Sequence, residues 1–369
     1  GLRSQYQQVI FAESYNTLSQ NEVESEIRTL RNLNDKVIFI AGGPHPSGDP
    51  SSALKAGFDY VVIGEGERTL ANLVYRLNKN QDTTSIPGIA FLNENGQVEQ
   101  TVSADSISLD ESIPYSTSPP IHPQIEILRG CPFRCHFCQV PALFGKPRSR
   151  SISSTKKIVE HYVSWFGKRG MVDLRFVAPN SLAYGSPTGR KLSLTQIEKL
   201  FKAISFDPRI RIFYASFPSE IRPEFLTTDV IQLFKEYISN EKIAIGGQSG
   251  SDRVLKLMRR GHDVPCILEA VDLTHKNGFI PSVDILFGFP GETPEDQWQT
   301  VDLIKRVGSK GGEVRLHYFL PLPGTSVSHL RPSPVSDSLL RELGSLTKDQ
   351  TAVGSFLNQL RFVQTSLKH

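Results

Sequence analysis

The sequence predicts an α/β protein of two domains, in which strands and helices alternate. Three observations support this prediction. Nearly all-apolar strand candidates alternate with amphipathic helical patterns along most of the chain. The length of 369 residues exceeds the roughly 250–300 residues over which a single hydrophobic core grows efficiently. A passage rich in Ser and Pro at 103–123 interrupts the alternation, and we expect it to be a linker that buries little surface.

The first domain, residues 1–102, is predicted to contain a parallel sheet and a hairpin. Its strand candidates are nearly all apolar, as in a sheet covered on both faces, and lie at 8–13, 37–43 and 59–64. Ser19 and Glu22 have the spacing of a capping box, which predicts a helix beginning after Ser19. The Asn-Gly pair at 95–96 lies between two short strand candidates and predicts a β-hairpin.

The second domain, residues 124–324, repeats a strand–helix unit six times. Its strand candidates lie at 124–129, 172–177, 210–216, 242–247, 281–287 and 313–319. The helical patterns lie at 153–168, 193–204, 223–239, 264–277 and 294–309. Six such units predict a parallel barrel or a doubly wound sheet. In a barrel, the loops after the strands build the site, and Tyr184, His317 and Tyr318 are pocket candidates by this position alone. The tail, 325–369, is expected to be helical.

The composition is that of an ordinary globular protein. The formal net charge is +3, with 38% hydrophobic and 21% charged residues. No run approaches the ~20 apolar residues of a membrane span, and no Lys/Arg stripe indicates a nucleic-acid partner. The first residues lack the features of a secretory signal, so we expect a cytoplasmic protein. Three of the four cysteines are crowded, unlike a secreted disulfide framework. Cys266 stands alone among apolar neighbours and is expected to be a buried small hydrophobe.

The crowded cysteines, Cys131, Cys135 and Cys138, have the spacing C-x3-C-x2-C. Thiolates on one short loop can bind a four-iron cluster, and three ligands leave one iron open for a further ligand. Two other interpretations exist: a structural zinc site that also uses His136 or His122, or three buried cysteines without a metal. Zinc usually takes two well-separated ligand pairs, and no second pair is present. The spacing therefore favours an iron–sulfur cluster.

With Phe137 just before the last cysteine, this loop resembles the signature of the radical SAM superfamily. The resemblance implies a six-stranded partial barrel, in agreement with the six predicted units. It also implies that the amino and carboxylate groups of S-adenosylmethionine chelate the open iron. One electron from the [4Fe-4S] cluster would then cleave the sulfonium and give a 5′-deoxyadenosyl radical, which abstracts hydrogen from the substrate.

Four further stretches resemble segments of that superfamily, at 176–185, 215–225, 243–262 and 284–293. The resemblance implies that nine residues contact S-adenosylmethionine: Phe137, Asn180, Ser181, Ser216, Glu220, Gln248, Ser249, Phe287 and Gly288. Many relatives have Gly-Gly-Glu where this chain has Ala-Pro-Asn-Ser at 178–181, which leaves the contact to the methionyl amine unassigned. Alternatively, the loop glycines serve turns, and Glu220 and Arg222 form a solvated ion pair.

The first domain resembles the cobalamin-binding domain that precedes the barrel in one branch of the superfamily. The resemblance rests on AGGPHP at 41–46 and VVIGEGERTL at 61–70. The implied cobalamin contacts are Ser14, Gly42, Gly43, Gly64, Glu65 and Gly66. The Asp-x-His-x-x-Gly loop of many such domains is not found in this sequence, so we expect a shortened, Rossmann-like domain. His45 is expected to be a loop residue. A scaffold without cobalamin, with ordinary glycine turns, is the alternative.

The sequence thus predicts a radical SAM enzyme that performs cobalamin-dependent C-methylation. Two alternatives stay open: a radical SAM enzyme with other chemistry and a purely structural first domain, or a zinc-stabilised binding module. The predicted cofactors are a [4Fe-4S] cluster, S-adenosylmethionine and cobalamin. The predicted partners are an electron donor such as a flavodoxin or ferredoxin and a small-molecule or peptide substrate, with neither nucleic acid nor membrane.

Overall fold

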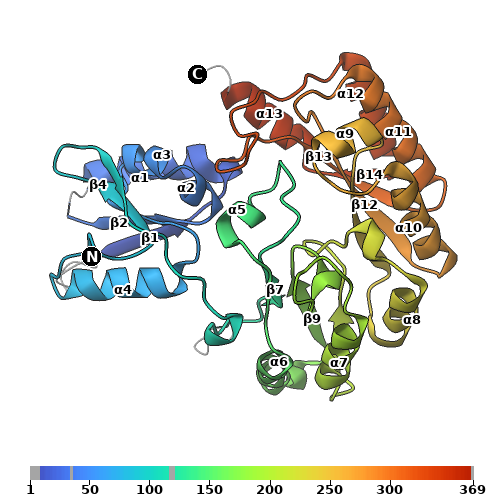
Figure 1. The fold of residues 1–369 in the computed structure, drawn as a ribbon, viewed down its shortest axis with the longest axis horizontal. Helices are drawn as coiled ribbons and strands as arrows, with labels where there is room; N and C mark the ends of the chain where they lie inside the picture. Colours follow the sequence, from blue (N-terminus) through green and yellow to red (C-terminus); the bar gives the residue numbers. More distant parts are fainter. Residues whose placement is uncertain (1–8, 34–35, 116–120, 367–369) are drawn as a thin grey trace. The chain divides into compact units, whose positions relative to one another are not determined.

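The computed structural model describes residues 9–33, 36–115 and 121–366, which form two compact units (Figure 1). The N-terminal unit comprises the described residues of Gly1–Ile107, Phe137–Phe144 and Pro321–His329. The barrel unit comprises the described residues of Ser108–His136, Gly145–Leu320 and Leu330–His369. Parts of three predicted segments lie outside the described residues: Gln8 of the first strand, 116–120 of the linker and 367–369 of the tail.

A five-stranded sheet forms the centre of the N-terminal unit, in the order β1-β2-β3-β4-β5. Three parallel strands are followed by two antiparallel ones: β1 (Ile10–Ser14), β2 (Ile38–Gly42), β3 (Tyr60–Val62), β4 (Ile89–Leu92) and β5 (Val98–Gln100). The helices are α1 (Gln20–Leu33), α2 (Pro44–Gly48), α3 (Pro50–Ala56) and α4 (Gly66–Asn78). The predicted strands and the hairpin are confirmed.

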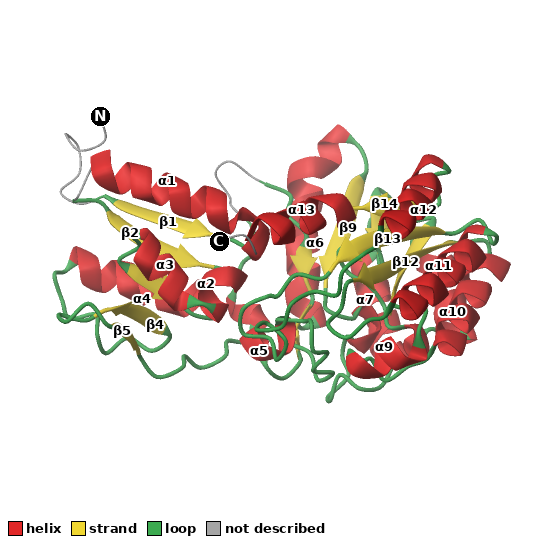
Figure 2. Cartoon of the chain, turned by 90° about the horizontal axis from the view of Figure 1, so that it is seen from above, coloured by secondary structure: helices red, strands yellow, loops and turns green. Residues whose placement is uncertain are grey.

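Both faces of this sheet are covered by helices. Phe39 lies in a buried cluster with Ile27 of α1 and Leu54 of α3. The next residue, Ile40, lies in a second cluster with Leu73 of α4. Successive side chains of a strand point to opposite faces. Figure 1 shows α1 on one side of the sheet and α4 on the other, and Figure 2 views the same helices from above. This two-sided burial explains the nearly all-apolar strands of the sequence.

Helix α1 begins at Gln20, directly after Ser19, as predicted, but its cap is a different residue. Asn16, rather than Ser19, provides the cap, because its Oδ1 accepts hydrogen bonds from the backbone N–H groups of Leu18 and Ser19 at 2.9 and 3.3 Å. Ser19 instead ends a short 3₁₀ turn, Thr17–Ser19, that precedes the helix. The predicted capping box is therefore wrong, since an asparagine three residues earlier satisfies the exposed N–H groups first.

The barrel unit contains the six predicted strand regions in parallel order. One sheet has the order β10-β9-β6 and another the order β11-β12-β13-β14. Their strands are β6 (Ile125–Glu126), β9 (Val172–Val177), β10 (Ile210–Phe213), β11 (Lys242–Gln248), β12 (Ile280–Phe287), β13 (Glu313–Tyr318) and β14 (Ala352–Gly354). An isolated parallel bridge between Ile221, after β10, and Ile245 of β11 connects the two sheets. This arrangement is a six-stranded partial barrel, with β14 as an added edge strand.

Helices cover the barrel strands on the side away from the barrel interior (Figure 1). They are α6 (Ile152–Phe166), α7 (Leu194–Ile204), α8 (Thr228–Tyr237), α9 (Asp252–Leu257), α10 (Val264–Lys276) and α11 (Pro294–Gly308). The start of α11 has Thr293 as its cap in a capping box with Asp296, and Pro294 occupies the first turn. No helix among the described residues is long and apolar enough to cross a membrane.

Two segments at the domain borders differ from expectation. The predicted linker buries Ile107 and Leu109, which are 3% and 1% exposed, so its first part packs against the protein. The tail is not purely helical: β14 lies between α12 (Asp337–Lys348) and α13 (Phe356–Ser366) and pairs with β13. Three residues with little periodicity, Ala352 to Gly354, could not be recognised as a strand in the sequence.

Two short segments from later in the sequence complete the N-terminal unit. One includes α5 (Val140–Phe144), directly after the cysteine loop. Gln139 Nε2 donates hydrogen bonds to the carbonyl oxygens of Pro44 at 3.0 Å and Pro323 at 2.8 Å. A Cβ at Gly48 would lie 2.4 Å from the Pro323 carbonyl oxygen, so these segments pack closely.

Candidate functional site

The cysteine loop begins directly after β7 (Leu128–Arg129), which pairs with β8 (Arg148–Ser149). Gly130 has a φ of +82°, and a Cβ there would lie 2.4 Å from the Lys146 carbonyl oxygen. Only glycine fits this close backbone approach. The Cys131 N–H donates to the Gly145 carbonyl at 3.1 Å, so the β7–β8 hairpin fixes the start of the loop.

Cys135 lies against two guanidinium groups in the barrel unit. It is 8% exposed, and its Sγ accepts hydrogen bonds from Arg222 Nη1 at 3.8 Å and Arg260 Nη1 at 3.6 Å. Burial raises the pKa of the Cys131 thiol, which the same two arginines partly offset. Cationic neighbours favour thiolates.

The thiol loop fits an iron–sulfur cluster by the chemistry of its donors. Three soft sulfur ligands lie within eight residues, with guanidinium donors at one of them, and such ligands select iron–sulfur clusters. Within the described residues, no three His, Cys, Asp or Glu side chains converge as ligands of a single metal ion. His136 Nδ1 pairs with the Leu257 carbonyl at 2.9 Å, and His122 packs against the rings of Tyr162 and Phe166.

Asn180 and Ser181 follow β9 and are both buried. Asn180 Oδ1 accepts a hydrogen bond from the Arg222 backbone N–H at 3.3 Å, whereas its Nδ2 is buried without a partner. A buried donor without a partner costs free energy. The Asn180 Nδ2 is therefore available to donate a hydrogen bond to a ligand. Ser181 is different, because its Oγ already pairs with Ser219 Oγ at 2.9 Å. A ligand contact by Asn180 has structural support that Ser181 lacks.

Glu220 lies in a polar cluster that the sequence only partly predicted. Gln248 Nε2 donates to Glu220 Oε2 at 3.5 Å, and Arg315 Nη2 lies 3.7 Å from Glu220 Oε1. Burial, followed by the nearby Asp284 carboxylate, raises the pKa of Glu220. A Cβ at Gly246 would lie 2.8 Å from Glu220 Oε2, so this glycine makes room for the carboxylate.

The members of this cluster that the sequence did not single out are Asp284 and Arg315. They are register partners on β12 and β13 and form an ion pair. His317 Nε2 lies 3.5 Å from Asp284 Oδ1. Arg315 Nε and Nη1 are buried without hydrogen-bond partners. Asp284 interrupts an apolar strand, which was the available signal, but its pairing with Arg315 depends on strand register that the sequence does not contain.

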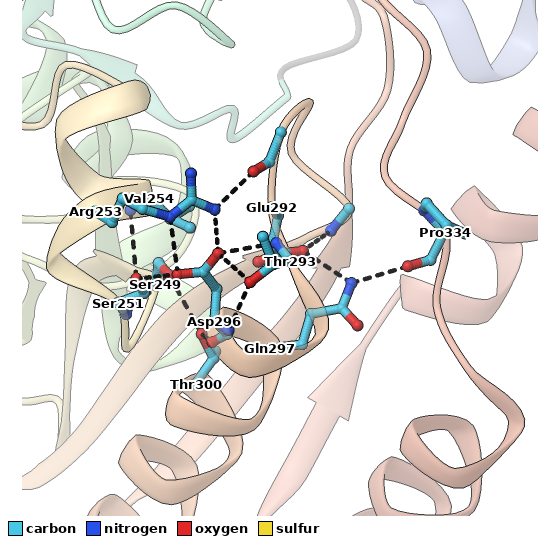
Figure 3. A network of polar contacts seen from close by, with 12 residues as sticks. Ser249, Ser251, Arg253, Val254, Glu292, Thr293, Asp296, Gln297, Thr300 and Pro334 are labelled. Atoms are coloured by element: carbon cyan, nitrogen blue, oxygen red, sulfur yellow. Dashed lines mark hydrogen bonds and ion pairs between the residues drawn. The ribbon is translucent and has the colours of Figure 1, made fainter.

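Ser249 and Phe287 have structural partners in the protein interior. Ser249 is 0% exposed, and its Oγ lies 3.2 Å from Thr300 Oγ1 of α11. Figure 3 shows this pair beside Asp296, which accepts a hydrogen bond from Ser251 Oγ at 2.6 Å. Phe287 packs against Phe356 with ring centroids 5.9 Å apart. Contacts of these two side chains with S-adenosylmethionine remain predictions.

The other predicted contacts of the barrel differ in their surroundings. Gly288 has a φ of +77°, and a Cβ there would lie 2.3 Å from the Tyr318 ring. The Ser216 carbonyl accepts a hydrogen bond from Ser219 N–H at 2.8 Å, and the Ser216 side chain is half-buried. Phe137, also half-buried, groups with the N-terminal unit. No ligand contact of these three residues is tested by the structure.

Of the three pocket candidates chosen by position, two are buried. Tyr184 and Tyr318 are 2% and 4% exposed, and their hydroxyls donate to the carbonyls of Arg150 and Ser333 at 2.9 Å each. They support the fold rather than line an open pocket. His317 keeps 28% of its side chain exposed. Cys266 is only partly buried, in the first turn of α10, which contradicts the prediction; burial raises the pKa of its thiol to about 11.

In the N-terminal unit, the predicted cobalamin residues lie at the carboxyl ends of β1, β2 and β3. A Cβ at Gly43, whose φ is +90°, would lie 2.7 Å from Ser14 Oγ. A Cβ at Gly42 would meet no atom within 4 Å. Gly64 N–H donates to Ser47 Oγ at 2.9 Å. Ligands of parallel α/β sheets bind at this edge, and Gly42 leaves open space there.

A cavity of about 200 Å³ lies beside the end of β3. Gly64 and Glu65 line it together with Ser47 and Leu143. Glu65 Oε2 accepts a hydrogen bond from the Ile107 N–H at 3.3 Å, and Gly66 begins α4. The cavity is smaller than the usual 300–1,000 Å³ of a ligand pocket, so it has room for part of a cofactor. The open edge at Gly42 and this cavity fit a cobalamin site.

His45 is not the loop residue that the sequence predicted. It lies in α2 and is 3% exposed, with its ring stacked on Tyr15 at 5.7 Å between centroids. Its Nδ1 lies 3.1 Å from Thr17 Oγ1, and its Nε2 is buried without a partner. Burial lowers the pKa of His45, because it favours the neutral form of the ring.

Comparison with known families assigns both units. A model of the B12 binding domain matches residues 7–74, and a model of the radical SAM superfamily matches residues 125–304. A tRNA-2-methylthio-N(6)-dimethylallyladenosine synthase of Sulfurihydrogenibium sp. is 31% identical over 235 residues, covering 62% of this chain and 50% of that protein. The Fervidobacterium nodosum protein of the same name is 26% identical over 92% of this chain and 73% of its own length. The chain thus spans only half of the first relative.

Solved structures share the fold. The methyltransferase TsrM from Kitasatospora setae, with cobalamin and a [4Fe-4S] cluster bound, has a TM-score of 0.68 at 19% identity, over 88% of this chain and 67% of that chain. The cobalamin-dependent S-adenosylmethionine radical enzyme OxsB has a TM-score of 0.66 at 17% identity, over 99% of this chain and 49% of that chain.

The two domains imply three cofactors, which are a [4Fe-4S] cluster, S-adenosylmethionine and cobalamin. The cysteine loop, the partial barrel and the glycine-lined sheet edge agree with that set. The chain therefore carries a radical SAM domain at 125–304, preceded by a B12-binding domain at 7–74.

Proposed function

We propose that this protein is a cobalamin-dependent methyltransferase that acts on an unactivated carbon of its substrate. The observation that carries the proposal is the B12-binding domain at 7–74 ahead of the radical SAM domain at 125–304. Bound together, the cofactors supply a hydrogen-abstracting radical from one S-adenosylmethionine and a methyl group from a second. The protein contributes binding, orientation and the exclusion of water.

In this proposal, different residues bind the cluster and S-adenosylmethionine. Cys131, Cys135 and Cys138 hold the cluster. The unpartnered Asn180 Nδ2 donates a hydrogen bond to S-adenosylmethionine, and the Glu220 carboxyl accepts one from it. Contacts by Gln248, which pairs with Glu220, belong to the same proposal. The remaining predicted residues contact S-adenosylmethionine through backbone groups or by van der Waals packing in this proposal: Phe137, Ser181, Ser216, Ser249, Phe287 and Gly288.

Cobalamin occupies the sheet edge of the N-terminal unit in this proposal. Ser14, Gly42 and Gly43 lie at the ends of β1 and β2, and the open space at Gly42 admits the cofactor. The cavity beside Gly64 and Glu65, ahead of Gly66, receives part of it. The electron comes from a flavodoxin or ferredoxin, and the substrate is a small molecule or peptide. The proposal places the protein in the cytoplasm, where thiols are kept reduced.

The proposal predicts two products from S-adenosylmethionine. Protein reconstituted anaerobically with iron, sulfide and hydroxocobalamin, then reduced, should form 5′-deoxyadenosine and S-adenosylhomocysteine, measured by mass spectrometry. Cobalamin absorbance should stay with the protein through gel filtration. Cluster-loaded protein that forms 5′-deoxyadenosine but retains no cobalamin would support the alternative of a structural N-terminal unit. Loaded protein that cleaves no S-adenosylmethionine would contradict both.

The cysteine loop gives a sharper version of this test. Cys135→Ala should remove 5′-deoxyadenosine formation, because one cluster ligand is lost, while cobalamin retention stays unchanged. Cys266→Ala is the matched control, since Cys266 lies in α10, and should keep both. Cleavage that persists at the wild-type rate in Cys135→Ala would refute the ligand assignment.

Methylthiolation of an adenosine in tRNA is a second candidate. The curated relatives with that activity in their name are 26–34% identical to this chain. The two candidates differ in product: incubation with tRNA and analysis of its nucleosides would reveal added sulfur only in the second. The B12-binding domain favours the first candidate, because methylthiolation adds sulfur, for which a methyl carrier alone is insufficient.

A further inference from the structure

Two buried arginines converge on a single sulfur of the cysteine loop. Arg222 and Arg260 are 4% and 8% exposed. Their Nη1 atoms lie 3.8 and 3.6 Å from Cys135 Sγ. Arg222 follows the bridge residue Ile221, and Arg260 follows α9, so two separate chain segments bring positive charge to the same thiol.

Both guanidinium groups are fixed by further contacts. Arg222 Nε donates to Glu224 Oε1 at 2.5 Å, and its Nη2 donates to the Arg260 carbonyl. The same guanidinium stacks on the Phe133 ring, 3.8 Å from its centroid. Arg260 Nη2 donates to the Gly246 carbonyl at 2.7 Å. These contacts leave one Nη of each arginine directed at Cys135, which is a preorganised arrangement.

Positive charge at a cluster ligand affects electron transfer. A cluster held by three thiolates gains one negative charge when it accepts an electron, and nearby cations stabilise that charge. N–H···S hydrogen bonds act in the same direction, because they draw electron density from the ligand sulfur. Burial strengthens both effects, since water screens them less.

We propose that Arg222 and Arg260 are positioning residues that donate hydrogen bonds to the Cys135 thiolate and raise the reduction potential of the cluster. This inference rests on the assignment of the cluster to the cysteine loop. It adds a function to two residues outside the ligand motif: they make uptake of the activating electron easier.

Glu224 allows the direction of the effect on the reduction potential to be tested. Its side chain pairs with Arg222 and, at 3.1 Å, with His262 Nδ1. Despite burial, which opposes ionisation, the hydrogen bond from His262 and the charge of Arg222 lower the pKa of Glu224 to about 2. The carboxylate therefore carries a negative charge that offsets part of the charge of Arg222. Removing it should shift the potential opposite to the arginine substitutions.

The experiment is a redox titration of the reconstituted protein, followed by the EPR signal of the reduced cluster. In Arg222→Gln and in Arg260→Gln, the ratio of reduced to oxidised cluster at a fixed potential should fall about tenfold, a shift of about 59 mV to more negative potential. Glu224→Gln should shift the midpoint to more positive potential. Arg222→Lys should shift the potential less than Arg222→Gln, because lysine keeps the positive charge but cannot donate to Cys135, Glu224 and the Arg260 carbonyl in the same geometry.

The controls separate this inference from the cluster assignment. Arg209→Gln removes one charge from an exposed arginine that pairs with Asp207 before β10, and its potential should equal that of wild type. Iron and sulfide are quantified in every variant. Wild-type protein that assembles no cluster would refute the cluster assignment. A wild-type cluster whose potential is unchanged in both arginine variants would overturn this inference alone. Where one glutamine variant does not fold, the other and Arg222→Lys still provide the comparison.

Discussion

Gly42 and Gly43 are adjacent at the end of β2, but they differ in what surrounds them. A Cβ at Gly43 would lie within 2.9 Å of Ser14 Oγ and of the Tyr15 backbone O and N atoms, and its φ of +90° is unfavourable for other residues. Gly42 faces open space. The first glycine therefore serves access to the sheet edge, whereas the second serves the packing of β1 against β2.

This difference predicts opposite outcomes for two alanine variants. Gly43→Ala should lose about 1–3 kcal/mol of unfolding free energy, the usual cost of a strained backbone, measured by urea denaturation. Gly42→Ala should keep its stability within about 0.5 kcal/mol but bind cobalamin more weakly. Equal cobalamin affinity in Gly42→Ala and wild type would mean that the cofactor does not approach this residue.

At the scale of single residues, the features that depend on neighbours in the chain could be predicted from the sequence. The cysteine spacing depends on neighbours in the chain, and this prediction could be made directly. The partners of Cys135 could not, because Arg222 and Arg260 are 87 and 125 positions away. Asp284 and Arg315 likewise meet only through the register of β12 and β13.

At the scale of elements, the loop between β12 and α11 is held by a buried carboxyl group. Glu292 Oε2 accepts hydrogen bonds from Gly288 N–H at 2.6 Å and Gln297 Nε2 at 3.2 Å. Figure 3 shows Glu292 beside Gln297. Gln297 also donates to the Pro334 carbonyl at 2.9 Å. Glu292 thus connects the strand end, the helix start and the segment before α12.

This carboxyl group should make stability depend on pH. Burial raises the pKa of Glu292 to about 7, although the hydrogen bonds from Gly288 and Gln297 oppose the shift. The unfolded chain releases this proton near pH 4.3. The stabilisation is therefore complete below about pH 4 and lost as the pH rises through about 7, on the order of 3–4 kcal/mol in total. Glu292→Gln should remove this part of the profile in urea denaturation at pH 5 and 8. An unchanged pH profile would contradict the buried, protonated state.

Some strands of the barrel unit could be predicted from the sequence, and others could not. The strands at 172–177 and 281–287 were predicted from buried apolar runs, and the structure has β9 and β12 there. The strand pattern alone left open the choice between a barrel and a doubly wound sheet, because that choice depends on the bridge at Ile221 and Ile245, which has no local signal. The cysteine motif, through its resemblance to the radical SAM superfamily, predicted the partial barrel. The strand β14 was missed because its three residues acquire their conformation from β13.

At the scale of the whole molecule, the tail completes the hydrophobic core of the barrel unit. Leu339, Leu343 and Phe356 are buried in the main cluster together with the barrel strands. The Phe356 ring lies 5.9 Å from Phe287 and 5.6 Å from Tyr318, between centroids. The tail therefore supports the carboxyl ends of β12 and β13 from below the surface.

Removing this support should be costly. Phe356→Ala should destabilise the protein by about 3–5 kcal/mol, because a large buried ring leaves a cavity. Leu357→Ala, next in the chain and 56% exposed, should change stability by less than about 0.5 kcal/mol. Thermal denaturation of the two variants measures the difference. Equal melting temperatures would show that the tail is not part of the cooperative core.

The N-terminal unit is discontinuous in sequence, since Gln139 and Pro323 both contribute to its packing around Pro44. During synthesis the ribosome produces residues 1–107 before the barrel strands, but Pro323 only after nearly all of those strands. Chains usually fold domain by domain from the amino terminus, but this unit is complete only after its last segment has been synthesised. Residues 1–107 alone therefore lack part of the fold, and we expect their final packing to form late in synthesis.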